Sequence, residues 1–142
     1  MERNIIDLHV HSTESDGTLT PEEVVAAAKE AGLSAIALTD HDTCSGVAKA
    51  KKAAAECGME LIPGIELSTS HTFPNGKEKE IHVVGLFIDT ENQALLDKTS
   101  EFRACRDSRN EKMVEALQKE GFPITMEALL AENPDCVITR AN

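Results

Sequence analysis

Residues 20–40 read TPEEVVAAAKEAGLSAIALTD, a helix signal followed at once by a strand signal. The first four, Thr20-Pro21-Glu22-Glu23, form a capping box with proline at the first helical position, which predicts the start of a helix. That helix is expected to end at Gly32, and the apolar run over residues 34–39 is typical of a buried strand. A helix that leads directly into a buried strand is the repeating unit of a parallel α/β sheet or barrel.

The same alternation extends to both sides of this unit. Strands are expected at residues 4–10, 59–67 and 80–88, and a helix at residues 45–57. Gly58 gives that helix its C-terminal stop, and Asn75-Gly76 is a strong hairpin signal, so we expect the last two strands to extend as an antiparallel arm. These patterns predict an α/β fold for this part of the chain.

The second part of the chain is expected to be helical. Thr90-Glu91-Asn92-Gln93 has the pattern of another capping box, which would open a long helix towards Gly121, and a short helix is expected over residues 126–131. We therefore predict two parts, a β/α domain over residues 1–90 and a helical insertion over residues 91–142.

Length and composition predict a folded protein of the cytoplasm. A chain of 142 residues with 41% apolar content is long enough for a domain with a core. It has neither the run of about 18 apolar residues that a membrane span needs nor a basic and apolar leader, so we expect no membrane association. The four cysteines lack Cys-x-x-Cys spacing and fit reduced, buried thiols.

The net charge of −11 restricts the class of partner. Extensive binding to nucleic acid or to an anionic membrane depends on Lys and Arg contacts to phosphate, and an acidic surface opposes both. A small phosphorylated substrate is compatible with this charge, because bound divalent cations reverse the local field.

Histidine is concentrated in short patterns that border the predicted strands. Four of the five histidines lie in Asp7-Leu8-His9-Val10-His11, Thr39-Asp40-His41-Asp42 and Ile81-His82, with Glu66 in the strand between. Imidazole and carboxylate are ligands that Zn²⁺, Mn²⁺ and Fe²⁺ accept, and strand ends gather such ligands on one rim. Alternate strand residues share a face, so His9 and His11 would bind one ion or lie on a polar surface. The conjunction favours a metal-dependent hydrolase.

These motifs carry a resemblance to a known family. Together with Ser15-Asp16-Gly17-Thr18 and Gly64-Ile65-Glu66, they resemble the PHP (polymerase and histidinol phosphatase) superfamily, and within it the stand-alone phosphoesterases that act on small nucleotide phosphates. The resemblance covers residues 5–90. It extends more loosely to the end of the chain, where Val137-Ile138-Thr139-Arg140 resembles a segment of that subgroup.

The resemblance implies a fold, a cofactor and a reaction. The fold would be the N-terminal part of a distorted (β/α)₇ TIM-like barrel followed by a helical insertion. Up to three divalent ions (Mn, Fe or Zn) would activate water and neutralise charge on a phosphoryl group. The implied ligands are His9, His11 and Glu66 for one ion, Glu66 and His82 for a second, and Asp16 and His41 for a third.

Other charged residues are candidates for supporting roles. Asp7, Asp40 and Asp42 would orient the imidazoles or cap loops and helices. For the phosphate, Arg140 offers a bidentate donor in the resembling segment. Arg103, Arg106 and Arg109 recur every three residues, so Arg109 would form a phosphate clamp with the other two. The alternative is that these three arginines form a solvated basic face.

The chain departs from the family in its second half. A barrel of this kind needs on the order of 200 residues or more, no histidine follows His82, and Asn142 stands where the subgroup has a histidine. We expect a piece of a longer protein, with association with another chain or a non-catalytic relic as alternatives. Self-association, or association with the missing half, is therefore expected. The alternative functions are an accessory domain of a DNA polymerase and a histidinol-phosphate phosphatase.

Overall fold

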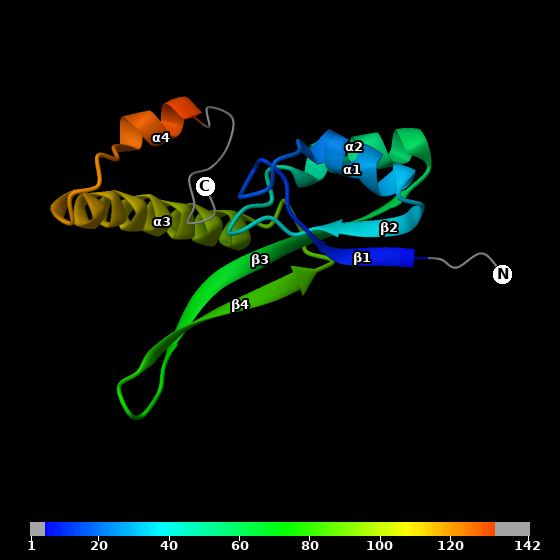
Figure 1. The fold of residues 1–142 in the computed structure, drawn as a ribbon. Coiled ribbons are helices and arrows are strands. Elements are labelled where there is room, and N and C mark those ends of the chain that lie inside the picture. Colours follow the sequence, from blue (N-terminus) through cyan, green and yellow to red (C-terminus); the bar gives the residue numbers. More distant parts are fainter. Residues whose placement is uncertain (1–4, 133–142) are drawn as a thin grey trace.

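Four strands form one sheet in the order β1-β2-β3-β4 (Figure 1). They belong to a computed structural model that describes residues 5–132. In chain order the elements are β1 (Ile5–Val10), α1 (Pro21–Glu30), β2 (Leu33–Leu38), α2 (Val47–Cys57), β3 (Glu60–Thr72), β4 (Glu78–Leu86), α3 (Gln93–Lys119) and α4 (Met126–Glu132). The expected α/β class and the order of its elements are confirmed.

The sheet has a parallel part and an antiparallel part. β2 pairs in parallel with both β1 and β3, whereas β3 and β4 pair antiparallel as a long hairpin that projects from the rest of the sheet (Figure 1). The hairpin turns at Asn75-Gly76, where Gly76 takes a φ of 77° and the Phe73 amide donates to the Lys77 carbonyl at 2.8 Å. The predicted antiparallel arm is therefore confirmed, and both strands reach further into it than the sequence pattern indicated.

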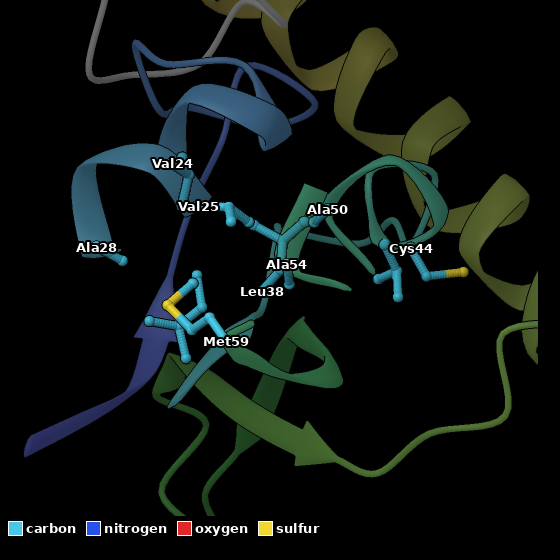
Figure 2. Close-up of a cluster of buried hydrophobic side chains, with 10 residues drawn as sticks. Val24, Val25, Ala28, Leu38, Cys44, Ala50, Ala54 and Met59 are labelled. Atoms are coloured by element: carbon cyan, nitrogen blue, oxygen red, sulfur yellow. The ribbon is translucent and has the colours of Figure 1, made fainter. Parts of the chain in front are cut away.

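Helices α1 and α2 lie next to each other and cover one face of the sheet (Figure 1). Between them and the strands lies the apolar core, which Figure 2 shows around Val25, Leu38, Ala50, Ala54 and Met59. Burying one large apolar side chain contributes roughly 1.5–3 kcal/mol, so this layer fixes the strands from whose ends the polar residues project.

Local signals set most of the element ends. Thr20 accepts from the Glu23 amide at 3.2 Å, and the Glu23 carboxylate accepts from the Thr20 amide at 2.8 Å, which confirms the predicted capping box. Helix α2 ends at Gly58 in the left-handed conformation, as predicted. The expected box at Thr90 is wrong. Asn92 caps α3 instead and accepts from the Leu95 amide at 3.1 Å, because asparagine is the stronger N-cap residue.

The helical segment after the sheet is long and little buried. Within α3 only Thr99, Asn110 and Val114 are buried. Of the cysteines, Cys105 on this helix is exposed, contrary to the expectation of buried thiols, and Cys136 lies outside the described residues. None of the helices between residues 5 and 132 combines the length and the apolar character that crossing a membrane requires. The domain boundary expected after residue 90 stays a prediction.

Candidate metal centre

The six residues predicted as metal ligands lie together, although they come from separate parts of the chain. His9 belongs to β1, Glu66 to β3 and His82 to β4. His11 and Asp16 lie in the loop after β1, and His41 follows β2 and forms an isolated bridge with Glu66. The parallel pairing of β1, β2 and β3 brings these positions to one rim, because carboxyl ends of parallel strands meet at the same edge.

Glu66 stands at the centre of this cluster, and its carboxylate is buried. Its Oε2 atom lies 2.8 Å from His9 Nε2, 3.0 Å from His11 Nε2 and 3.5 Å from His41 Nδ1. The Oε1 atom faces the other way and lies 3.0 Å from His82 Nδ1. One carboxylate therefore has both oxygens among four imidazoles.

Asp16 supplies a second carboxylate on the far side of two of these rings. Its Oδ1 lies 2.8 Å from His11 Nδ1, and its Oδ2 lies 3.5 Å from His41 Nε2. His11 and His41 thus each have one nitrogen towards Asp16 and the other towards Glu66. The four imidazoles form a row, with neighbouring ring centroids 4.6–5.0 Å apart.

The geometry fits bound metal. Potential ligand atoms lie within 4.8 Å of one another in three groups: His9, His11 and Glu66; His11, Asp16 and His41; and His41, Glu66 and His82. Two atoms that each lie about 2.0–2.2 Å from one ion are at most about 4.4 Å apart, so small adjustments bring each group into range. In addition, His41 Nδ1 is buried and has no hydrogen-bond partner among residues 5–132. A metal would satisfy that nitrogen.

The shifted pKa values of His41, Glu66 and Asp16 also suit metal binding. Burial lowers the pKa of His41, against the opposing effect of the nearby Glu66 and Asp16 carboxylates, and so favours the neutral imidazole. Burial raises the pKa of Glu66, but the hydrogen bond with His9 and the nearby histidine charges outweigh it and lower the pKa. The pKa of Asp16 is lowered by the same balance, with His11 as hydrogen-bond partner. Neutral imidazoles and ionised carboxylates are the forms that bind metal.

Asp40 holds the loop that carries Asp16. This buried carboxylate accepts from the Ser12 amide at 2.7 Å, from the Ser12 hydroxyl at 2.7 Å and from the Ser15 hydroxyl at 2.6 Å. Sequence reasoning missed both serines as contributors to the site. Ser15 was noticed only as part of a motif, and the nearer partner of its hydroxyl, Asp40, lies 25 residues away.

Asp7 and Asp42 also contact the protein backbone. Asp7 accepts from the His9 amide at 3.1 Å. Asp42 accepts from the Ser68 amide at 2.8 Å and from the guanidinium of Arg106. Within the described part of the chain, hydrogen bonds to Asp7, Asp40 and Asp42 come from amide, hydroxyl and guanidinium groups. Any influence on the imidazoles therefore passes through the segments that carry the histidines.

The arginines of α3 differ in their surroundings. The side chain of Arg106 is 11% exposed and also donates to the Ser68 hydroxyl at 2.8 Å. Arg109 is 43% exposed and lies 3.7 Å from Glu80. Both line a cavity of about 430 Å³ between the hairpin and α3, and Arg106 together with Arg103 also lines a small cavity beside His41. The other predicted substrate residue, Arg140, lies outside the described residues, as does Asn142.

Comparison with known proteins gives relatives of several kinds, which include a nuclease, a phosphatase and, over a shorter segment, an error-prone DNA polymerase. The chain is 39% identical to the 5'-3' exoribonuclease of Haemophilus influenzae over 136 residues, which are 96% of this chain and 47% of that protein. It is 36% identical to the 3',5'-nucleoside bisphosphate phosphatase of Chromobacterium violaceum over 137 residues, or 93% of this chain and 45% of the relative.

A solved structure shows the same fold. An amidohydrolase from Chromobacterium violaceum, solved with bound sulfate and no metal, superposes with a TM-score of 0.85 at 36% identity, covering 98% of this chain and 47% of that chain. The chain thus spans about half the length of the relatives it matches, and the expectation that its fold is part of a larger barrel is confirmed. Residues 7–127 match the PHP domain, a range that contains all six candidate ligands, and the chain therefore belongs to the PHP domain family.

Proposed function

We propose that this chain carries the N-terminal half of the active site of a metal-dependent phosphoesterase. The observation that carries the proposal is the position of Glu66, whose two oxygens lie 2.8–3.5 Å from nitrogens of four histidines. A carboxylate with two oxygens can bridge two cations, whereas each imidazole nitrogen has one lone pair for a metal. Two relatives are named as an exoribonuclease and as a nucleoside bisphosphate phosphatase, and both names denote hydrolysis of a phosphoester. This supports the same reaction class for the present chain.

The proposed ligands follow the three clusters. His9, His11 and Glu66 would hold one ion, Glu66 and His82 a second, and Asp16 and His41 a third, with Mn, Fe or Zn as the candidate metals. Divalent ions at such a centre lower the pKa of water and neutralise charge on phosphoryl oxygens. The chain's own contribution is to favour a neutral His41 and ionised carboxylates at Asp16 and Glu66, in line with the lowered pKa values of these three groups.

For the substrate we propose a small phosphorylated molecule, with a nucleoside bisphosphate as the first candidate. The 36% identity to a nucleoside bisphosphate phosphatase supports this choice. Arg109, at the exposed side of the cavity between the hairpin and α3, is a candidate phosphate contact, as is Arg140. The second candidate is the 5' end of RNA, because the chain is 39% identical to an exoribonuclease.

We also propose a setting for this activity. The chain spans about half of its relatives, so full turnover would require the rest of the barrel, either in a longer polypeptide or in an associated chain. Cys44, Cys57 and Cys105 are free thiols, which supports a reducing compartment such as the cytoplasm.

Metal binding by the chain itself tests the first step. After removal of metal with a chelator, the wild type is expected to take up about one equivalent or more of Mn²⁺ or Zn²⁺. Glu66→Gln removes the central charge and should weaken binding by at least about tenfold. Glu60→Gln, the same change at an exposed position of β3, should have no effect. Wild-type protein that binds no metal in this titration would contradict the proposal.

Substrate preference needs a separate assay. The assay compares two reactions: phosphate release from a nucleoside 3',5'-bisphosphate and mononucleotide release from 5'-phosphorylated RNA. Each reaction is measured for residues 1–142 alone and for the chain combined with the second barrel half. We expect slow turnover by residues 1–142 and faster turnover by the completed barrel. Faster hydrolysis of RNA than of the bisphosphate would favour the second candidate.

A further inference from the structure

Arg106 on α3 forms a largely buried ion pair with Asp42, although 64 residues separate them. The side chains are 11% and 2% exposed. The same guanidinium nitrogen donates to the Ser68 hydroxyl at 2.8 Å, so Arg106 joins α3 to β3 and to the segment after β2. Arginine suits such a place because its guanidinium stays charged when buried and carries several hydrogen-bond donors.

Asp42 connects Arg106 to the metal cluster. It directly follows His41, and its other carboxylate oxygen accepts from the Ser68 amide at 2.8 Å. The Asp42 amide donates to the Glu66 carbonyl at 2.9 Å, and the Glu66 amide donates to the Asp40 carbonyl at 3.1 Å. Hydrogen bonds from the residues on both sides of His41 therefore join its backbone to that of Glu66. The Asp42 side chain adds a further connection to Ser68, two residues further along β3.

The conformation of Asp42 requires such support. Its φ of 54° lies in the left-handed region, which is unfavourable for a residue with a side chain and persists only where the surroundings hold it. A buried carboxylate also needs compensating donors, and removing the charged partner of such a group is strongly destabilising. Arg106 provides the compensating charge, and Ser68 provides a backbone donor.

We propose that Arg106 is a positioning residue: by holding Asp42, it fixes His41 relative to Glu66 and makes metal affinity depend on helix α3. This inference rests on the proposed metal role of His41 and Glu66. It gives Arg106 a different task from Arg109: both line the cavity, but the side chain of Arg109 is the more exposed of the two. Helix α3 then has two uses, one arginine holding the centre together and another available to a ligand.

The test measures metal affinity rather than turnover. In Arg106→Met the apolar length is kept and the charge is lost. We expect the affinity for Co²⁺ and Mn²⁺ to fall by about 10–100-fold, because loss of a residue that orients metal ligands typically has an effect of this size. The absorption spectrum of bound Co²⁺ should change as well. Lys112→Met, an exposed position on the same helix, is the control and should bind as the wild type does. Arg106→Lys should recover part of the affinity, since the ammonium keeps the positive charge but not the planar guanidinium geometry.

A second variant separates positioning from stability. Asp42→Asn combined with Arg106→Met removes the uncompensated buried charge, so its unfolding midpoint in chelator should return towards that of the wild type while metal affinity stays low. Wild-type affinity in both Arg106→Met and the double variant would overturn the positioning role and leave the proposed function intact. Absence of metal binding by the wild type would overturn both.

Discussion

Gly64 lies two residues before Glu66, at a point where β2, β3 and β4 come close together. A Cβ atom at this position would stand 2.6 Å from Thr39 Cγ2, 2.9 Å from the Leu38 carbonyl oxygen and 3.1 Å from the Gly85 carbonyl oxygen. Two of these neighbours are backbone atoms of adjacent strands, so they can move only if the sheet moves. The strand that carries Glu66 thus depends on a residue without a side chain.

Gly64→Ala should therefore destabilise the fold. Overpacking of a close contact typically costs about 1–3 kcal/mol, and urea unfolding followed by circular dichroism would measure the loss. Gly85→Ala is the matched control on β4, where the nearest atoms to an added Cβ lie at 3.5 Å, an ordinary contact. A Gly64→Ala protein as stable as Gly85→Ala would contradict the close approach described here.

At this scale the sequence predicts residue types better than their partners. The histidines stood out because imidazole is rare and lies here at strand ends, so the clustering of six candidate ligands was predictable. The contacts of Asp40 with Ser12 and of Arg106 with Asp42 were not, because they join residues 28 and 64 positions apart that have many alternative uses. Such pairs follow from tertiary packing and leave no local pattern.

At the scale of an element, helix α1 shows how well neighbouring residues in the sequence predict where a helix begins. Its capping box satisfies two backbone groups at the N-terminus, and the acidic residues of the first turn match the helix dipole. Start, proline position and cap were all predictable, because every contributor lies within a few residues. For α3 the overlapping signals at Thr90 and Asn92 competed, and the stronger cap determined where the helix begins.

The charge of Glu23 should make α1 sensitive to pH. Hydrogen bonds from the Thr20 amide and hydroxyl lower the pKa of Glu23 below its ordinary 4.5. A carboxyl with a lowered pKa in the folded state adds stability above its unfolded pKa and loses it as pH falls through the folded value. Glu23→Gln keeps an acceptor oxygen and removes the charge. It should be less stable than the wild type at neutral pH and equal to it in acid.

Thermal unfolding of both proteins across this pH range would measure the difference. Glu22→Gln is a suitable control, since it lies in the same first turn and shares the dipole effect. A Glu23→Gln difference that stays constant from neutral pH to below the folded pKa would show that the charge has no part in the cap.

At the scale of the whole molecule, the unpaired edge strands of the sheet are the feature that bears on association. β1 and β4 are the two edges of the four-stranded sheet, and Ile5, Ile6 and Phe87 are large apolar residues left exposed near them. Unpaired strand edges and exposed apolar side chains favour association. We therefore still predict association with a second copy or with the second half of the barrel, and sedimentation at rising protein concentration would detect the first of these.

The metal cluster draws its residues from β1, the following loop, the end of β2, and the β3–β4 hairpin, so bound metal would tie these elements together. Anything that binds only the folded state stabilises it, by about 2.7 kcal/mol at a free concentration roughly 100 times the Kd. Adding Mn²⁺ to chelator-treated protein should therefore raise the unfolding midpoint, and the rise should grow with the logarithm of the metal concentration.

A pair of histidine variants makes this prediction specific. His41 lies 3.5 Å from both Asp16 and Glu66, so His41→Ala should remove most of the metal-dependent rise. His71 lies in the outer part of β3 and packs against Phe73 with ring centroids 4.8 Å apart, away from the three candidate ligand groups. His71→Ala should keep the full rise. Equal loss in both variants would indicate nonspecific binding of metal to the acidic surface, and an undiminished rise in His41→Ala would exclude His41 from the site.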